Sequence, residues 1–376
     1  MAKGKLGFGL MRLPQKSDNP TDIDLETLNK MVDLFIDRGF TYFDTSYVYH
    51  NGESERAINK ALAQRHDRTT YTLASKLPAF SITEEEQVNK TFNEQLSKCG
   101  VEYFDYYLLH NLNRTLYDTY VKSCKMFEHA IQWKKDGKIK HLGFSFHDSA
   151  DVLDKILKEH PEVEFVQIVV NYYDWEEGFI QAKKCYETIR KHGRQVVIME
   201  PVKGGTLAQV PDEVLIKMKK LNQTLSPASY AIRFAAELDG VIAVLSGMST
   251  LEQVQDNTSY MQDFKPLSKE EKEILKFAKL EYEKQWKFKC SDWSKVDDNT
   301  HNGVPVSNII RAYNSLLIQP NPYFGAELNY YKTFKLGYKT EIENDDYSKC
   351  TKAVNGELDV NEAVKESIEF FNKNGF

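Results

Sequence analysis

Short apolar runs that alternate with amphipathic helical segments are the feature that most constrains how this chain folds. Most of the runs are unbroken rather than alternating, which is the pattern of strands buried on both faces of a parallel sheet. The segments between them carry apolar residues every three to four positions, as helices packed on a sheet do. The predicted strands are residues 5–10, 41–43, 68–75, 103–109, 139–144, 165–169, 195–199 and 241–245.

Repeated strand–helix units imply right-handed crossovers between parallel strands. A set of this length, about 260 residues, is the size of a TIM barrel, for which ~250 residues is typical. We therefore predict an α/β fold, a (β/α)8 TIM barrel over residues 1–284, with single helices expected at 117–135 and 178–191. A doubly wound sheet is the competing architecture, but no Gly-x-Gly-x-x-Gly follows any predicted strand, which weakens its dinucleotide-binding form.

The composition changes after Trp286, where Asn, Tyr, Lys and Asp become frequent. We predict that residues 285–376 form a small appended helical unit, with short helices at 307–317 and 360–371.

Charge and cysteine usage exclude several classes of protein. The formal net charge is −6, with Lys and Arg scattered along the chain, which argues against a nucleic-acid surface. No apolar run approaches the roughly 20 residues of a membrane span. The cysteines are odd in number and far apart, which fits a reducing cytoplasm rather than a disulfide framework. They are Cys99, Cys124, Cys185, Cys290 and Cys350.

Three consecutive predicted strands end in residues that can carry chemistry. Asp44 and Tyr49 follow the second strand, Lys76 ends the third and His110 ends the fourth. Each has a structural alternative, since a lone Tyr is usually packing, a lone Lys solvated and a lone His satisfied by neighbours. In a barrel, however, these three strand ends are neighbours on the face where active sites lie.

Together these residues would make a proton donor. A free phenol has a pKa of about 10, and a nearby lysine ammonium lowers that value. Asp44 would anchor Lys76, and His110 would orient a carbonyl oxygen while Tyr49 protonates it. No side chain of this set is a reductant, so a bound hydride donor is implied.

At these residues the chain resembles the aldo-keto reductase family, over roughly residues 5 to 260. The resemblance implies a TIM barrel that reduces an aldehyde or ketone with NAD(P)H, with Asp44, Tyr49, Lys76 and His110 as the catalytic set. The motifs that carry it occur in order: LGFGLMRLP, FDTSYVYHNGESE, LASK, DYYLLH, GKIKHLGFSFH, VQIVVNYYD and SGMSTLEQVQDN.

The same resemblance implies a coenzyme site and no metal. Ser145 and Gln167 match positions that bind the nicotinamide carboxamide, and Met199 falls where relatives place an aromatic ring. The loop over the pyrophosphate is matched by Pro201, Val202, Gly204, Gly205 and Leu207. The adenosine end is matched by Gly247, Met248, Ser249, Gln253, Asp256 and Asn257, and the set is completed by Gly9, Met11 and Asp44.

The coenzyme is expected to be NADP(H) or NAD(H), with NADP(H) slightly favoured. Met248 and Gln253 stand where many NADP-preferring relatives carry Lys and Arg, and Lys203 is a candidate replacement cation. Candidates for the rim of the substrate pocket are Met11, Tyr47, His50, His147, Tyr173 and Trp175.

The tail is similar to the ferredoxin-like unit that ends some bacterial members of the family. That unit carries two four-cysteine motifs, but here Cys290 and Cys350 alone match, and Gly303 and Val354 stand where cysteines are expected. Because a [4Fe–4S] cluster usually needs four thiolates, we expect no iron–sulfur cluster.

The leading prediction is thus a cytoplasmic NAD(P)H-dependent carbonyl reductase whose partner is a small-molecule carbonyl compound. The alternative is a nicotinamide-binding sensor or interaction module with little turnover, which would have no need of the proton-donating set.

Overall fold

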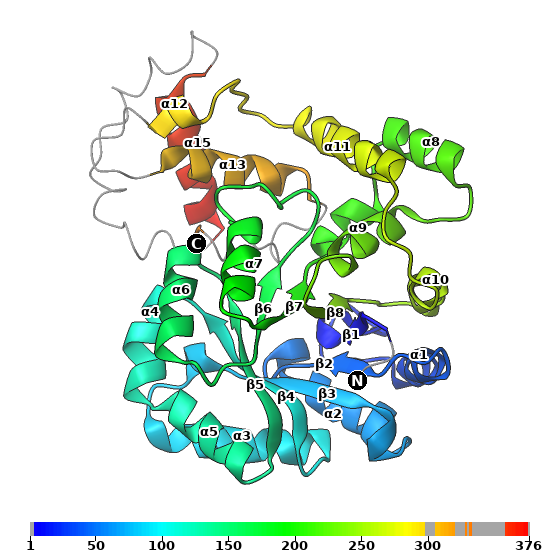
Figure 1. Cartoon of the computed structure of the whole chain (residues 1–376), viewed down its shortest axis with the longest axis vertical. Coiled ribbons are helices and arrows are strands. Elements are labelled where there is room, and N and C mark those ends of the chain that lie inside the picture. Colours follow the sequence, from blue (N-terminus) through cyan, green and yellow to red (C-terminus); the bar gives the residue numbers. More distant parts are fainter. Residues whose placement is uncertain (1–3, 298–304, 320–327, 329–330, 333–357, 375–376) are drawn as a thin grey trace.

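The centre of the molecule is a closed barrel of parallel strands that follow one another in chain order (Figure 1). The computed structural model describes residues 4–297, 305–319, 328, 331–332 and 358–374. The (β/α)8 barrel predicted from the sequence is confirmed. Its strands are β1 (Leu6–Gly9), β2 (Tyr42–Asp44), β3 (Thr72–Leu77), β4 (Phe104–Leu112), β5 (Ile139–Phe146), β6 (Phe165–Val169), β7 (Gln195–Met199) and β8 (Val241–Ser246).

Helices surround the barrel and continue beyond it. Those of the barrel series are α1 (Leu25–Asp37), α2 (Ser54–Ile58), α3 (Glu85–Cys99), α4 (Arg114–Leu116), α5 (Met126–Lys135), α6 (Ala150–Glu159), α7 (Ala182–Lys191), α8 (Asp212–Leu221), α9 (Pro227–Ala236) and α10 (Leu251–Met261). They are followed by α11 (Lys269–Glu283), α12 (Ser294–Asp297), α13 (Val306–Leu317) and α15 (Val360–Lys373).

Two predicted helices differ from the structure for the same reason. The helix expected at 117–135 is interrupted at Lys125, which has a left-handed backbone with φ of 49°. The helix expected at 178–191 begins only at Ala182, after Gln181 with φ of 55°. A single non-glycine residue in this conformation reverses the chain locally, and apolar periodicity does not reveal it.

The barrel has two apolar layers because successive strand residues point to opposite faces. Outward-facing residues pack under the helices, as Phe43 and Leu73 do. Inward-facing residues fill the barrel and make it a packed core rather than a pore. The inner layer consists of Tyr42, Ala74, Leu108, Phe165, Val197, Ala243 and Leu245.

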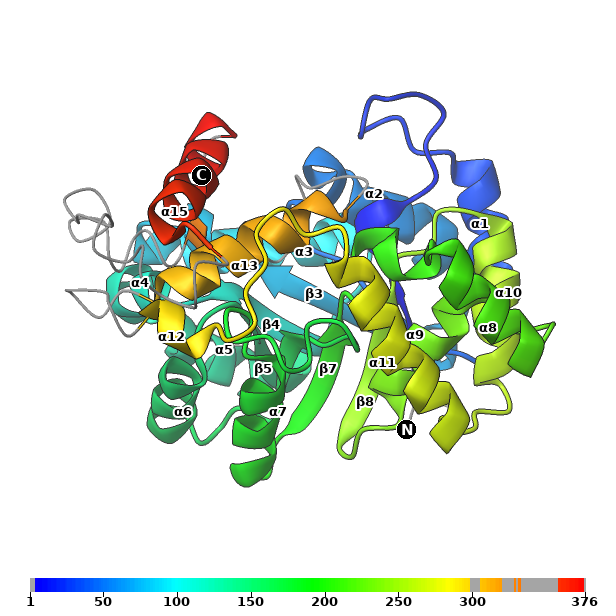
Figure 2. The same ribbon diagram turned by 90° about the horizontal axis from the view of Figure 1, so that it is seen from above.

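The C-terminal helices form a separate apolar cluster beside the barrel. Helices α13 and α15 pack together (Figures 1 and 2). Their cluster includes Ile310, Val364 and Phe371, and it also contains Phe179 from the segment between β6 and α7. The tail is therefore joined to the barrel by shared apolar packing.

The positions that bear on an iron–sulfur cluster lie mostly outside the described residues, among them Gly303, Cys350 and Val354. Cys290 is described and is partly buried against the apolar cluster of the C-terminal helices. Within the described ranges no helix is long and apolar enough to span a bilayer.

The burial of a helical side chain predicts how much it contributes to the free energy of unfolding. Leu28 on α1 is fully buried, whereas Leu280 on α11 is 59% exposed. We expect Leu28→Ala to lower the free energy of unfolding by about 2–5 kcal/mol, because it leaves a cavity under the helix. Leu280→Ala is the matched control and should change it by less than about 0.5 kcal/mol. Urea unfolding of the two variants measures both values, and equal losses would contradict the packing described here.

Candidate active site

The inner layer of the barrel changes from apolar to polar at the carboxyl ends of the strands. Asp44, Lys76, His110, Gln167 and Met199 each lie two residues beyond an inward-facing side chain of the same strand. The two-residue period of a strand therefore directs all five toward the barrel axis. Residues from five strands, β2, β3, β4, β6 and β7, thus converge on one site.

Tyr49 reaches this site from a tight turn after β2. The next two residues, His50 and Asn51, both have left-handed backbones, with φ of 54° and 53°. His50 holds the turn in place: its Nε2 accepts from the backbone N–H of Leu13 at 3.0 Å, and its Nδ1 donates to the carbonyl oxygen of Pro20 at 2.8 Å. His50 thus fixes the position of the turn that carries Tyr49.

The four predicted catalytic residues lie together. The ammonium of Lys76 donates to Asp44 Oδ1 at 2.5 Å and to the carbonyl oxygen of Thr45 at 2.8 Å. The same nitrogen is 3.4 Å from the hydroxyl of Tyr49. The rings of Tyr49 and His110 are 6.0 Å apart and nearly perpendicular. A phenol, a cation and an imidazole therefore surround one point at the mouth of the barrel.

The buried ion pair sets the charge of the site. Burial lowers the pKa of Lys76, but the charge and hydrogen bond of Asp44 outweigh it and hold that pKa above the ordinary value. Burial raises the pKa of Asp44, and the Lys76 ammonium opposes the rise. We take the pair as ionised, since each charge compensates the other in a place without water.

The phenol of Tyr49 is protonated. Burial raises its pKa above 10, the Lys76 ammonium opposes this rise, and Asp44 adds to it. Lys76 thus lowers the pKa of the phenol as the sequence predicts, but burial outweighs it. Tyr49 therefore carries its hydroxyl proton, and the Lys76 ammonium lies where it would stabilise a phenolate.

Two neutral imidazoles lie in the same cavity wall. Burial, followed by the charge of Lys76, holds the pKa of His110 well below its usual value. Burial lowers the pKa of His147 to about 4. Nδ1 of His110 hydrogen-bonds with the Ser46 hydroxyl at 3.0 Å, which leaves Nε2 for a ligand. The ring can thus hydrogen-bond a polar ligand atom without bringing a second positive charge.

One cleft of about 580 Å³ runs from Tyr49 across the barrel mouth. This volume lies within the range of small-molecule and cofactor sites. Arg12, Glu200, Ser226 and Glu252 also line it and were not found from the sequence. Of the predicted coenzyme residues the cleft is lined by Gly9, Met11, Asp44, Gln167, Met199, Pro201, Val202, Gly204, Gly205, Gly247, Met248, Ser249, Gln253, Asp256 and Asn257.

Two predicted coenzyme residues do not line the cleft. Ser145 is buried, and its hydroxyl accepts from the backbone N–H of Asn111 at 2.7 Å. Leu207 is buried in an apolar cluster with Tyr173 and Tyr282. Lys203, the candidate phosphate ligand, is also buried, and its ammonium pairs with Asp174 at 2.8 Å. Lys203 is therefore committed inside the protein, and Arg12 is the cation that the cleft wall offers.

A second cavity of about 1040 Å³ meets the first at Tyr49. Its wall contains His110, His147 and Met11, and Phe80 stands beside His110 at a ring distance of 5.5 Å. Of the predicted rim residues Met11, His50 and His147 line it, whereas Tyr47, Tyr173 and Trp175 do not. Tyr49 is thus shared by two cavities, as a group that links two ligands would be.

The loop after β7 closes one side of the cleft in an unusual conformation. Glu200, Lys203, Gly204 and Gly205 all have left-handed backbones, with φ of 54°, 48°, 64° and 104°. Glycine adopts this readily, but each of the other two residues costs about 1–3 kcal/mol and persists only where surrounding contacts enforce it. The open backbone at the two glycines leaves room for a ligand to approach.

The low pKa of His110 can be measured directly. We expect its ring to stay neutral at pH 6 in NMR titration of ¹⁵N-labelled histidines, with His110→Asn used to assign the signal. The unfolded chain binds a proton at this histidine near pH 6.5, whereas the folded site does not. The histidine therefore lowers the free energy of unfolding as the pH falls below that value. A titration midpoint at or above 6.5 would contradict the burial described for the ring.

Comparisons with known proteins agree with this architecture. The uncharacterized oxidoreductase YqkF of Bacillus subtilis is 21% identical over 282 residues, which cover 67% of this chain and 85% of that protein. An aldo-keto reductase of Mycolicibacterium paratuberculosis is 26% identical over 260 residues, 68% of this chain and 79% of its own. The crystal structure of a Klebsiella pneumoniae aldo-keto reductase in complex with NADPH shares the fold, with a TM-score of 0.60 at 17% identity over 74% of this chain and 96% of that one. Residues 5–278 match the model of the aldo/keto reductase family, so the chain belongs to that family.

Proposed function

We propose that the protein reduces the carbonyl group of an aldehyde or ketone with NAD(P)H, and that Tyr49 donates the proton. The observation that carries the proposal is the contact of Tyr49 with the buried Lys76–Asp44 ion pair where the two cavities meet. A protein that only binds a dinucleotide has no need of a phenol held beside a buried cation. The membership of the chain in the aldo/keto reductase family supports the same assignment.

The residues of the cleft fit a nicotinamide dinucleotide. The side-chain oxygen of Gln167 is buried and has no hydrogen-bond partner among the described residues, and an amide of the ligand can satisfy it. Arg12 has no partner for its guanidinium in the described part of the chain and can face a phosphate. NADP(H) is the slightly preferred coenzyme, and activity with NADPH against NADH decides between the two.

The chain's own groups account for the proton. The coenzyme, when bound, supplies the hydride to the carbonyl carbon. Tyr49 transfers its hydroxyl proton to the carbonyl oxygen, and the remaining phenolate is stabilised by the Lys76 ammonium. With Ser46 donating to Nδ1 of His110, Nε2 carries the proton and hydrogen-bonds the carbonyl oxygen. Asp44 keeps Lys76 charged and in place throughout.

The role of Tyr49 is tested by removing one oxygen atom. We expect Tyr49→Phe to lower kcat for carbonyl reduction by about 10²- to 10⁴-fold, the usual contribution of a general acid. Its Kd for the coenzyme, from quenching of protein fluorescence, should change less than about twofold, because a phenol hydroxyl adds little to binding. Tyr47→Phe is the matched control on the same turn, since its hydroxyl donates only to Glu94, and it should retain its turnover.

Retention of most of the kcat by Tyr49→Phe would remove Tyr49 as the acid. Tight coenzyme binding by the native protein without reduction of any aldehyde, ketone or quinone would instead favour a sensor or interaction module.

The unpaired amide of Gln167 gives a separate test of the coenzyme site. We expect Gln167→Leu to raise the Kd for NADPH and NADH by about 2- to 10-fold, the value of a lost hydrogen bond. Gln195→Leu serves as the control, because this glutamine begins the next strand and is exposed. Titration of protein fluorescence measures both constants, and equal affinities of the two variants would place the carboxamide elsewhere.

A further inference from the structure

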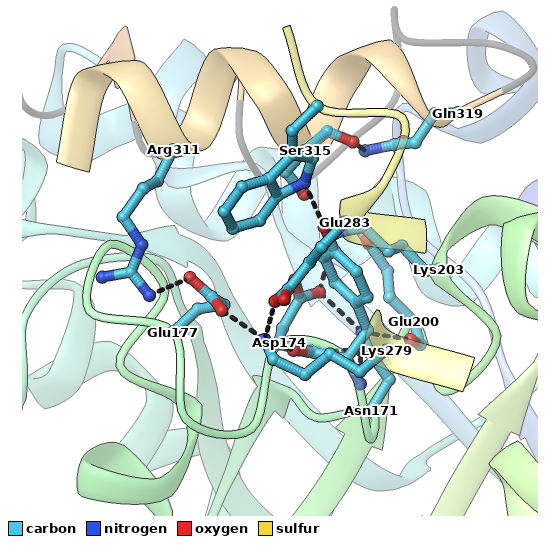
Figure 3. Close-up of polar contacts among 12 residues, drawn as sticks. Asn171, Asp174, Glu177, Glu200, Lys203, Lys279, Glu283, Arg311, Ser315 and Gln319 are labelled. Carbon is cyan, nitrogen blue, oxygen red and sulfur yellow. Dashed lines mark hydrogen bonds and ion pairs between the residues drawn. The ribbon is translucent and has the colours of Figure 1, made fainter. Parts of the chain in front are cut away.

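The segment that follows β6, residues 170–181, lies between the loop of the cleft and the C-terminal helices (Figure 3). On the cleft side it makes two connections to the loop. The amide of Asn171 donates to the carbonyl oxygen of Glu200 at 3.2 Å, and the carboxylate of Asp174 pairs with Lys203 at 2.8 Å. These contacts hold the two non-glycine residues of the loop that have left-handed backbones.

On its other side the same segment is held by two helices of the C-terminal part. The carboxylate of Glu177 is 3% exposed and accepts from Arg311 on α13 and from Lys279 on α11 (Figure 3). Lys279 also donates to the carbonyl oxygen of Tyr173 at 3.1 Å, and the indole of Trp286 donates to the hydroxyl of that tyrosine at 2.8 Å. The contacts between this segment and the C-terminal part therefore include both ion pairs and neutral hydrogen bonds.

The segment is short, and hydrogen bonds within it link the residues that contact the loop to the residue that contacts α13. Asn171 Oδ1 accepts from the backbone N–H of Asp174 at 2.9 Å, and the backbone N–H of Glu177 donates to the carbonyl oxygen of Asp174 at 3.0 Å. The backbone also approaches α13 closely at Gly178, where a Cβ atom would lie 3.0 Å from the amide oxygen of Asn308. A shift of α13 therefore moves the residues that hold the loop.

We propose that Arg311 of the C-terminal unit is a positioning residue for the coenzyme loop, acting through Glu177 and the Asp174–Lys203 pair. This inference rests on the proposed function, since it assigns the cleft to a dinucleotide. The buried Glu177 carboxylate needs its cations, because a buried charge that loses a partner is strongly disfavoured. Without Arg311 the carboxylate is left with Lys279, which also pairs with Glu283. The segment is then held less firmly to α13, and so are its contacts with the strained backbone of the loop.

The experiment compares coenzyme binding in full-length variants. Arg311→Ala should raise the Kd for NADPH and NADH by roughly 3- to 30-fold, the range for residues that modulate a site without touching its ligand. The KM for the carbonyl substrate and the kcat at saturating coenzyme should stay within about twofold of the native values, because the catalytic residues are untouched. Arg311→Lys keeps the charge and should recover part of the affinity.

Lys287→Ala is the matched control. Lys287 pairs with Glu366 inside the C-terminal unit and touches neither the segment nor the loop, so its coenzyme affinity should equal the native value. A double-mutant cycle of Arg311→Ala with Asp174→Asn should show a combined loss smaller than the product of the two single losses, because both act through one connection.

Native coenzyme affinity in Arg311→Ala, or an equal loss in Lys287→Ala, would overturn the inference and leave the proposed function intact. A native protein that binds neither NADPH nor NADH would overturn the proposed function and the inference together. If Arg311→Ala does not fold, Glu177→Gln tests the same connection, and unchanged affinity in that variant would equally refute it.

Discussion

The buried ion pair of Lys76 and Asp44 is the interaction on which the site depends. A lone ammonium or carboxylate without contact with water would be neutralised, and neither residue could then act on Tyr49. Because the two lie on adjacent strands and both point inward, each compensates the charge of the other over 2.5 Å while the pair stays buried. Burying two charges costs desolvation free energy, which is offset only when the geometry of the pair is good. The barrel backbone holds both side chains in that geometry.

The closed barrel converts a simple sequence period into a three-dimensional arrangement. Inward-facing positions occur every second residue, so the residue that follows the apolar layer on each strand points to the axis. Asp44, Lys76 and His110 reach their places by this rule alone, and Gln167 and Met199 follow it on the opposite wall. Only Tyr49 needs an irregular element, the turn that His50 fastens to the loop after β1.

This difference explains what the sequence could predict. Strand ends and their order are local features, so the barrel and the meeting of Asp44, Tyr49, Lys76 and His110 at its mouth could be predicted from the chain alone. The burial of Lys203 could not be predicted, because its partner Asp174 lies on another loop. The residues next to Lys203 in the sequence do not indicate that its side chain is buried. Arg12 ends the short 3-10 helix after β1, and its position next to Met11 was a usable signal. Phe80 had no signal beyond its place shortly after Pro78.

Three buried carboxylates of the molecule each form an ion pair that connects two elements of the fold. Asp44, Asp174 and Glu177 are each paired with a lysine or arginine from a different element, and each pair fixes where that element lies. Buried ion pairs contribute little net stability compared with apolar packing, but they tolerate few alternative arrangements, because a misplaced partner leaves a charge uncompensated. Apolar contacts such as those of Phe179 attach the C-terminal helices to the barrel, and the Glu177–Arg311 pair adds a charged contact between α13 and the segment after β6. Because Glu177 pairs with Arg311, the segment that contacts the cleft loop is tied to a residue more than 100 positions away in sequence.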